Sequence, residues 1–345
     1  MVELDPHTAV WETTLACNSN CLHCGSDAKT VRPNELTTAE AFDLVDQLAD
    51  LDFKLIIESG GEPLLRKDWF EISQRIQEKD MGLGIISNGL NWKKGTIDKL
   101  VELQPYSIGF SIDGEPRLHD YLRGVPGSHK KVFQQIKQIK KEDLTICAIT
   151  AVNNNNNLKQ LGKIRDRIST YNIDAWQIQM ASPMGRMSKN QNLLLDENEY
   201  YKLGEFIAET RKLLPRVNVQ AGDCIGYFGD LGPKVYDDEW GGCIAGINGL
   251  GIESDGTIKG CLSIQSDLAK EGNIRDESLK TIWSDPTRFK YTRNFKVSDL
   301  KGNCFDCYRG AECKGGCSSQ SMSFFNEFHH APYCFTIHEA RGKNV

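Results

Sequence analysis

Three cysteines stand close together near the start of the sequence, in the stretch CNSNCLHC at positions 17, 21 and 24. Three thiolates can hold three irons of a four-iron cluster while the fourth iron stays open. An open metal position is typical of catalytic sites, whereas structural sites close it with a fourth ligand. The spacing also suits a zinc site with His23 as the fourth ligand, so the cysteines alone leave both interpretations open.

A second field of cysteines lies in the last third of the chain. Cys243 and Cys261 flank Gly256, and after a gap a C-x2-C-x5-C-x3-C run is followed by one more cysteine. The members of the run and the cysteine after it are Cys304, Cys307, Cys313, Cys317 and Cys334. Zinc would accept this spacing as well, but zinc cannot accept an electron.

The chain has 12 cysteines and an N-terminus without the basic and apolar regions of a signal peptide. In a reducing compartment such cysteines are expected to bind metal rather than to form disulfides. We therefore predict a cytoplasmic protein. Cys147 stands apart in an apolar stretch, where a buried, unreactive thiol is expected.

Strand and helix patterns alternate through the first part of the chain. Short β-branched runs occur at 9–14, 55–59, 83–87, 106–111, 145–152 and 175–180. Helical stretches follow them at 36–51, 67–79, 94–103, 128–141, 158–168 and 197–214, the first with a capping box of Thr37 and Glu40. Six strand–helix units predict a parallel sheet wrapped by helices, either doubly wound or a partial barrel. The first three cysteines follow the first strand, at the edge where loops carry chemistry.

The composition changes after about residue 220, where glycine and cysteine become frequent and the strands become shorter. We predict a first domain over residues 1–215 and a second over 216–345, the latter held together more by metal than by an apolar core. The net charge of −6 argues against a nucleic-acid partner. No apolar run approaches the about 20 residues that cross a membrane, so no membrane association is expected.

Short motifs after the next strands carry a resemblance. ESGGEP follows the second strand, ISNG ends the third, SIDG ends the fourth, and HDYLRG comes soon after. With C-x3-C-x2-C on a chain of six strand–helix units, this order resembles the radical S-adenosylmethionine (radical SAM) superfamily. The resemblance implies a partial (β/α)6 barrel, a [4Fe–4S] cluster on Cys17, Cys21 and Cys24, and SAM bound to the open iron.

The same resemblance assigns residues to SAM. The GGEP element, Gly60, Gly61, Glu62 and Pro63, would receive the amino group of SAM, and glycines there let a backbone approach a ligand. Ribose and carboxylate contacts are implied for Ser87, Asn88, Ser111 and Asp113. Arg123 would bind the SAM carboxylate, and His23 would pack near the adenine.

The second cysteine field resembles the SPASM extension of radical SAM enzymes that modify peptides. Its seven cysteines and the glycine all have counterparts here. The resemblance implies two auxiliary [4Fe–4S] clusters, an outer one on Cys304, Cys307, Cys313 and Cys334 and an inner one on Cys243, Cys261 and Cys317. Cys224 is the candidate for the fourth inner ligand, and the alternative is an open iron. Three [4Fe–4S] clusters are thus expected in total.

The implied reaction begins when an electron donor such as flavodoxin or ferredoxin reduces the first cluster. SAM is then cleaved to a 5′-deoxyadenosyl radical, which takes a hydrogen atom from the substrate. In sulfatase-maturing relatives a catalytic aspartate follows the second SPASM cysteine, but Leu262 stands there in this chain. We therefore expect a precursor-peptide substrate that receives a C–C or thioether crosslink. Arg186, in MASPMGRM, is a candidate substrate contact at the barrel mouth.

Only 16 residues precede Cys17, which leaves no room for an N-terminal leader-binding domain. A separate leader-binding protein, or the SPASM surface, would then recognise the peptide. Two alternatives remain open. One is a radical SAM enzyme acting on a small molecule such as a tetrapyrrole or sugar. The other is a non-catalytic iron–sulfur or zinc-binding module.

Overall fold

A computed structural model describes residues 3–236 and 240–342. The strands of these ranges are β1 (Thr8–Thr14), β2 (Leu55–Gly60), β3 (Gly82–Ser87), β4 (Ser107–Ser111), β5 (Ile146–Val152), β6 (Ala175–Met180), β7 (Asn218–Ala221), β8 (Gly249–Ile252), β9 (Thr257–Lys259) and β10 (Lys270–Asn273). The helices are α1 (Thr38–Asp50), α2 (Trp69–Glu78), α3 (Thr96–Leu103), α4 (Pro116–Arg123), α5 (Ser128–Ile139), α6 (Leu158–Thr170), α7 (Glu197–Leu213), α8 (Gly232–Val235), α9 (Leu279–Ser284), α10 (Lys290–Arg293), α11 (Gly310–Cys313), α12 (Ser318–Phe325) and α13 (Phe335–Gly342).

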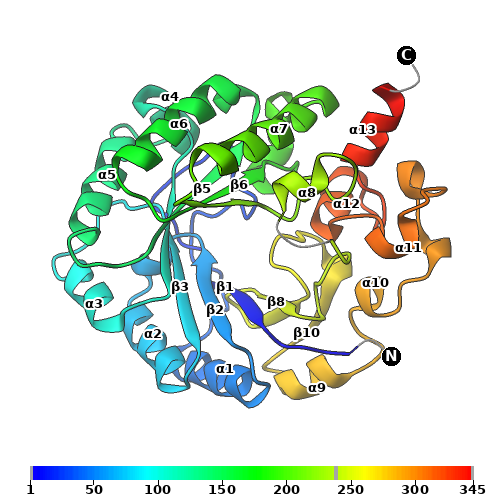
Figure 1. The fold of residues 1–345 in the computed structure, drawn as a ribbon. Helices are drawn as coiled ribbons and strands as arrows, with labels where there is room; N and C mark the ends of the chain where they lie inside the picture. The colour runs from blue at the N-terminus through cyan, green and yellow to red at the C-terminus, as the bar shows by residue number, and fades with distance from the viewer. Residues whose placement is uncertain (1–2, 237–239, 343–345) are drawn as a thin grey trace.

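All these strands belong to one sheet, in the order β10-β9-β8-β1-β2-β3-β4-β5-β6-β7. Neighbours from β1 to β7 are parallel, and β8 is parallel to β1. The helices α1 to α7 surround the curved sheet, and the C-terminal part of the chain lies at one side (Figure 1). This is the barrel-like parallel core that the alternating pattern predicts, followed by a cysteine-rich C-terminal region.

The six predicted strands and the six predicted helices are confirmed, with small shifts at their ends. Parallel strands covered on both faces are apolar almost throughout, which explains the clear signal of runs such as LIIES. The capping box at the start of α1 is also confirmed, since Thr37 accepts from the Glu40 backbone and Glu40 accepts from the Thr37 backbone. Leu44, Leu48 and Ile72 are among the fully buried residues that α1 and α2 place against the sheet.

The structure departs from the predicted elements in three places. The short strand β7 and the short helix α4 carried no clear pattern. The asparagine run at 153–157, which lies between the predicted elements, contains a turn of 3-10 helix over Asn154–Asn156. Cys147 lies in β5 as expected, but it is half-buried rather than buried.

The second part of the chain is more closely joined to the first than predicted. β8 extends the sheet on the free side of β1, with Trp11 opposite Ile252. Leu250, Ile258 and Trp283 pack in the same apolar core as the barrel residues. The expectation of a module held mainly by metal is therefore wrong for its first half. A separate small cluster of buried residues surrounds the last cysteines. In the part of the chain described by the structure, no helix is long and apolar enough to span a membrane.

Candidate metal centre

The loop between β1 and α1 carries Cys17, Cys21 and Cys24 at the carboxyl edge of the parallel sheet. Backbone hydrogen bonds fix it on both sides, from Cys17 N to Lys29 O (3.2 Å) and from Leu22 N to Leu122 O (2.9 Å). The thiol sulfurs accept backbone N–H groups, Cys17 from Ser19 (3.4 Å) and Cys24 from Ala28 (3.4 Å). Burial raises the pKa of Cys17 to about 11 in the metal-free protein. Partly buried thiols that accept hydrogen bonds are a suitable donor set for an iron–sulfur cluster.

The GGEP loop packs directly on this cysteine loop. Gly61 N donates to Thr14 O (2.8 Å), and Glu62 N donates to Ala16 O (2.8 Å). A Cβ on Gly61 would overlap Ala16 O, and Gly60 has a φ of +110° that favours glycine. Both glycines are thus required by the contact between two protein segments, in addition to any ligand. Pro63 is buried and begins a turn of 3-10 helix after the loop.

The side chain of Glu62 points to the end of β3. Its carboxylate is buried and accepts from Ser87 Oγ (2.8 Å) and from Asn88 N (2.7 Å). Burial raises the pKa of Glu62 to about 7, although these hydrogen bonds oppose the shift. Each carboxylate oxygen thus has a protein donor and can accept a further one, so the contribution of Glu62 to binding an amino group stays a prediction.

Asn88 joins the end of β3 to the cysteine loop. Its Nδ2 donates to Asn18 Oδ1 (2.7 Å) and lies 3.7 Å from Cys17 Sγ. Asn18 in turn donates to Leu90 O (3.2 Å). Asn18 was not a predicted site residue, and the sequence offers no signal for it beyond its place next to a cysteine.

The end of β4 contributes a buried carboxylate. Ser111 is the last residue of this strand, and Asp113 follows it in the loop. Asp113 Oδ2 lies 2.6 Å from Arg123 Nε and 3.2 Å from His23 Nε2. Burial raises the pKa of Asp113, but the charges of Arg123 and His23 outweigh that effect and lower it below its usual range. Arg123 Nη1 also lies 3.6 Å from Cys21 Sγ.

The end of β6 and the segment after it contact Cys224, helix α12 and the first cysteine loop. Met180 N donates to Cys224 Sγ (3.2 Å), and Ser182 Oγ is hydrogen-bonded to Gln320 on α12, just after Cys317. Arg186 N donates to Cys24 O (2.9 Å). The Arg186 guanidinium donates to Cys21 O (2.9 Å) and Ala28 O (3.0 Å). These contacts of Arg186 hold the cysteine loop, and a contact of Arg186 with a substrate stays a prediction.

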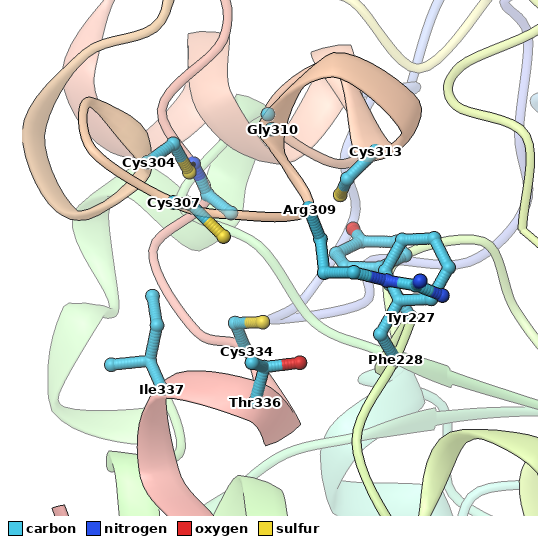
Figure 2. A pocket seen from close by; sticks show the side chains of 12 residues that line it. Tyr227, Phe228, Cys304, Cys307, Arg309, Gly310, Cys313, Cys334, Thr336 and Ile337 are labelled. Atoms are coloured by element: carbon cyan, nitrogen blue, oxygen red, sulfur yellow. Dashed lines mark hydrogen bonds between the residues drawn. The ribbon is translucent and has the colours of Figure 1, made fainter. Parts of the chain in front are cut away.

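Four cysteines of the second field line one pocket, as the labelled side chains in Figure 2 show. They are the predicted outer set, Cys304, Cys307, Cys313 and Cys334. Tyr227 and Phe228 form another wall of this pocket, and the Arg309 guanidinium lies over the Phe228 ring at 4.1 Å. The four thiols of the predicted outer set thus surround one pocket, which is the arrangement that the ligands of a four-iron cluster require.

The remaining cysteines of the second field lie near one another. Burial raises the pKa of Cys317, and the neighbouring thiols of Cys243, Cys261 and Cys224 raise it further. The backbone N–H of Cys317 donates to the Tyr227 hydroxyl (2.9 Å). Tyr227 therefore contacts both sets of cysteines, a role that nothing in the sequence indicated.

Over residues 3–236 and 240–342, no three His, Cys, Asp or Glu side chains are close enough together to hold a single metal ion. A cluster does not require that arrangement, because each thiolate binds its own iron. The cysteines of the described chain are free thiols, as a cluster requires.

The fold and these cysteine-lined sites define an α/β enzyme built for iron–sulfur chemistry. Two family models match the chain: the radical SAM superfamily over residues 11–168, and the SPASM iron–sulfur cluster-binding domain over residues 243–308. Together the matches span more than half of the sequence. The chain belongs to the radical SAM superfamily and carries a SPASM domain, and its cofactors accordingly include a [4Fe–4S] cluster, SAM and further iron–sulfur clusters.

Relatives of two kinds are similar to this chain. The AdoMet-dependent heme synthase of Methanosarcina barkeri is 26% identical over 345 residues, which cover 95% of this chain and 96% of the relative. The mycofactocin maturase MftC of Mycobacterium tuberculosis is 24% identical over 322 residues, covering 90% of this chain and 78% of the relative.

Solved structures agree on the fold. SuiB of Streptococcus suis bound to S-adenosylmethionine has a TM-score of 0.74 at 18% identity, covering 91% of this chain and 73% of that one. The structure of anSMEcpe with bound AdoMet has a TM-score of 0.72 at 18% identity, covering 97% of this chain and 95% of that one.

Proposed function

We propose that this radical SAM/SPASM enzyme oxidatively modifies a ribosomally made precursor peptide and forms a C–C or thioether crosslink in it. The proposal assigns Cys17, Cys21 and Cys24 to the SAM-binding cluster. The outer auxiliary cluster takes Cys304, Cys307, Cys313 and Cys334, and the inner one takes Cys224, Cys243, Cys261 and Cys317.

The observation that carries the proposal is the segment Met180–Arg186. Its contacts to Cys224, to α12 and to the first cysteine loop bring the two cysteine fields to one edge of the sheet. A substrate held at that edge faces the SAM site on one side and the inner auxiliary site on the other. That arrangement suits a reaction that removes a hydrogen atom and must then dispose of an electron.

The chain's own residues hold and enclose the reacting groups. When bound, the first cluster and SAM supply a one-electron cleavage that yields a hydrogen-abstracting radical. The GGEP element, Gly60 to Pro63, would receive the SAM amino group, and Ser87, Asn88, Ser111 and Asp113 would line its ribose and carboxylate side. Glu62 holds the ends of β2 and β3 together through Ser87 and Asn88. His23 would pack near the adenine, and the buried surroundings would exclude water.

Three observations support a peptide substrate. The structure of SuiB bound to precursor peptide SuiA matches this chain with a TM-score of 0.74, and MftC is named as a maturase. Leu262 stands where a sulfatase-maturing enzyme would need its base. The buried Arg66 and the partly buried Arg123 and Arg186 all contact protein acceptors, which makes them less suited to bind the carboxylates of a tetrapyrrole.

A tetrapyrrole is the second candidate substrate. The relatives named AdoMet-dependent heme synthase include one that matches almost the whole of this chain and almost its own whole length. The proposed external partners are an electron donor such as flavodoxin or ferredoxin and, for a peptide, a separate leader-binding protein.

The first test is anaerobic reconstitution followed by metal analysis. We expect about 12 irons per chain, from three four-iron clusters, and formation of 5′-deoxyadenosine after addition of dithionite and SAM. Zinc in place of iron, or no SAM cleavage by the iron-loaded protein, would contradict the enzyme assignment.

The second test separates the substrates. The reduced, SAM-loaded enzyme is incubated with peptides encoded beside its gene and, separately, with iron–coproporphyrin, and both are analysed by mass spectrometry. A mass loss of two hydrogens on a peptide supports the proposal. Loss of carboxyl groups from the porphyrin, with unchanged peptides, supports the second candidate instead.

A further inference from the structure

Arg123 brings a charged side chain into contact with a sulfur of the first cysteine loop. Its Nη1 lies 3.6 Å from Cys21 Sγ, whereas Cys17 and Cys24 receive neutral donors from Ser19, Asn88 and Ala28. The Arg123 side chain is only 13% exposed. One thiolate of three therefore faces a buried cation.

Asp113 holds that cation in place. Its Oδ2 lies 2.6 Å from Arg123 Nε, and its Oδ1 accepts from Ala151 N at 3.0 Å, which ties the carboxylate to β5. His23 Nε2, in the cysteine loop itself, lies 3.2 Å from the same Oδ2. Asp113 is fully buried, so it positions Arg123 from a fixed point in the barrel.

We infer that Arg123 and Asp113 set the reduction potential of the cluster on Cys17, Cys21 and Cys24, with Arg123 raising it and Asp113 lowering it. One-electron reduction by an external donor adds one negative charge to the cluster. A cation beside a ligating sulfur stabilises the reduced form, and an anion behind it destabilises that form. Both charges are buried, where such effects are stronger than in water.

This inference rests on the proposed ligation of a cluster by Cys21. It gives Arg123 a role that differs from a contact with the SAM carboxylate, because the Cys21 contact exists without SAM. Arg123 is a positioning residue in this sense, acting through the sulfur. A measurement made in the absence of SAM therefore isolates the effect.

The test is an anaerobic redox titration of the reconstituted full chain without SAM, followed by electron paramagnetic resonance. Signals that change when SAM is added afterwards identify the first cluster. We expect Arg123→Gln to shift the midpoint potential of this cluster downward and Asp113→Asn to shift it upward, while the other clusters keep their potentials. Arg123→Lys, which keeps the charge, should stay near the wild-type value.

Opposite shifts are the signature of charge, since mere loosening of the loop would move both variants in one direction. The matched control is Arg75→Gln, which removes an arginine paired with Asp46 at 2.7 Å on the outer helices. It should leave the potential unchanged. Equal potentials in all variants, or shifts of the same sign, would overturn the inference. If the Arg123→Gln variant loses iron, the midpoint potentials of the Arg123→Lys and Asp113→Asn variants still decide whether the inference holds. Failure of the wild type to form any cluster would instead reject the proposed function.

Discussion

Gly61 illustrates how a single residue can carry two requirements. Its place in the GGEP element was predicted from a family resemblance that concerns ligand binding. The structure adds a packing reason, since a Cβ there would overlap Ala16 O and the neighbouring Leu15 backbone. The sequence identifies the glycine, but only the fold reveals which atoms lie against it.

A substitution tests this packing. Gly61→Ala should destabilise the metal-free protein by about 1–3 kcal/mol, because the backbone of the cysteine loop has to move. Urea unfolding under reducing conditions measures the loss. Gly162→Ala is the control, since that helical position has open space for a Cβ and alanine is favoured there by about 0.5–1 kcal/mol. Equal stabilities of the two variants would contradict the packing argument.

Glu58 gives a second prediction at this scale, concerning pH. This residue of β2 is fully buried, and burial raises its pKa to about 8, although Ser73 and Arg66 oppose the shift. Ser73 Oγ donates to one carboxylate oxygen at 3.0 Å, and the other oxygen has no hydrogen-bond partner. The folded protein therefore keeps the proton over a range in which the unfolded chain, with a pKa of about 4.3, has lost it.

The sign of the effect follows from this difference. Between about pH 4.5 and pH 8 the native state binds the extra proton, so the contribution of Glu58 to stability falls as pH rises. Above pH 8 the native carboxyl also ionises and the loss levels off. Glu58→Gln lacks this dependence, and its stability relative to wild type should increase from pH 5.5 to pH 8. Urea unfolding of both proteins at pH 5.5 and pH 8 measures this difference in stability. A difference that does not change with pH would show that Glu58 is ionised throughout.

At the scale of elements, the β8–β9 hairpin contains a buried ion pair. Lys259 Nζ lies 2.6 Å from Glu253 Oε1 and donates to Ile264 O at 3.1 Å, just beyond Cys261. Arg32 Nη2 lies 3.5 Å from the same Glu253 oxygen. The pair thus links the hairpin to the chain beyond the first cysteine loop.

Removing one partner of this pair should be costly. Glu253→Gln leaves the buried Lys259 without its counter-ion, and we expect a loss of about 3–5 kcal/mol in the free energy of unfolding. The double variant Glu253→Leu with Lys259→Met should recover most of the lost stability. The control is Asp267→Asn, which breaks an exposed pair with Lys270 and should leave the free energy of unfolding nearly unchanged, because water screens exposed pairs. A similarly small loss for Glu253→Gln would mean that water reaches the buried pair.

The elements also show what could be predicted from sequence. The six strands were found because buried parallel strands are continuous apolar runs, and α1 because Thr37 and Glu40 mark its start. By contrast, β7 has only four residues, and α4 buries only His119 and Leu122, so neither shows a clear apolar period. The pairing of β8 with β1 joins positions more than 230 residues apart, and no local pattern specifies such a contact. The hydrogen bonds of Asn18, Ser182 and Gln320 depend on that long-range assembly in the same way.

For the whole molecule, the division at residue 215 remains a prediction, and the sheet offers a test of it. A chain of residues 1–215 would lose β8 from beside β1 and β7 from beside β6. It would also expose core residues such as Trp11 and Phe206, which pack in one core with Leu250 and Ile252. We expect this fragment to lack a cooperative thermal transition, with aggregation at the temperature where the full chain is folded.

Circular dichroism of the metal-free chains measures the thermal transition, and sedimentation velocity measures the aggregation. A chain that ends at residue 342 serves as the control and should unfold like the full protein. A monomeric 1–215 fragment with a cooperative transition near that of the full chain would show that the first domain folds by itself.

The strand β8 also sets the separation between the two groups of cysteines. Because β8 is hydrogen-bonded to β1, the register of one sheet sets the span from the first cysteine loop to the cysteines that follow β8 and β9. A slip by a single residue would turn every side chain of β8 to the opposite face. The sheet thus fixes how far the first cysteine loop lies from the cysteines after β9. In the proposed reaction, the substrate rather than the protein would have to adapt its shape to that separation.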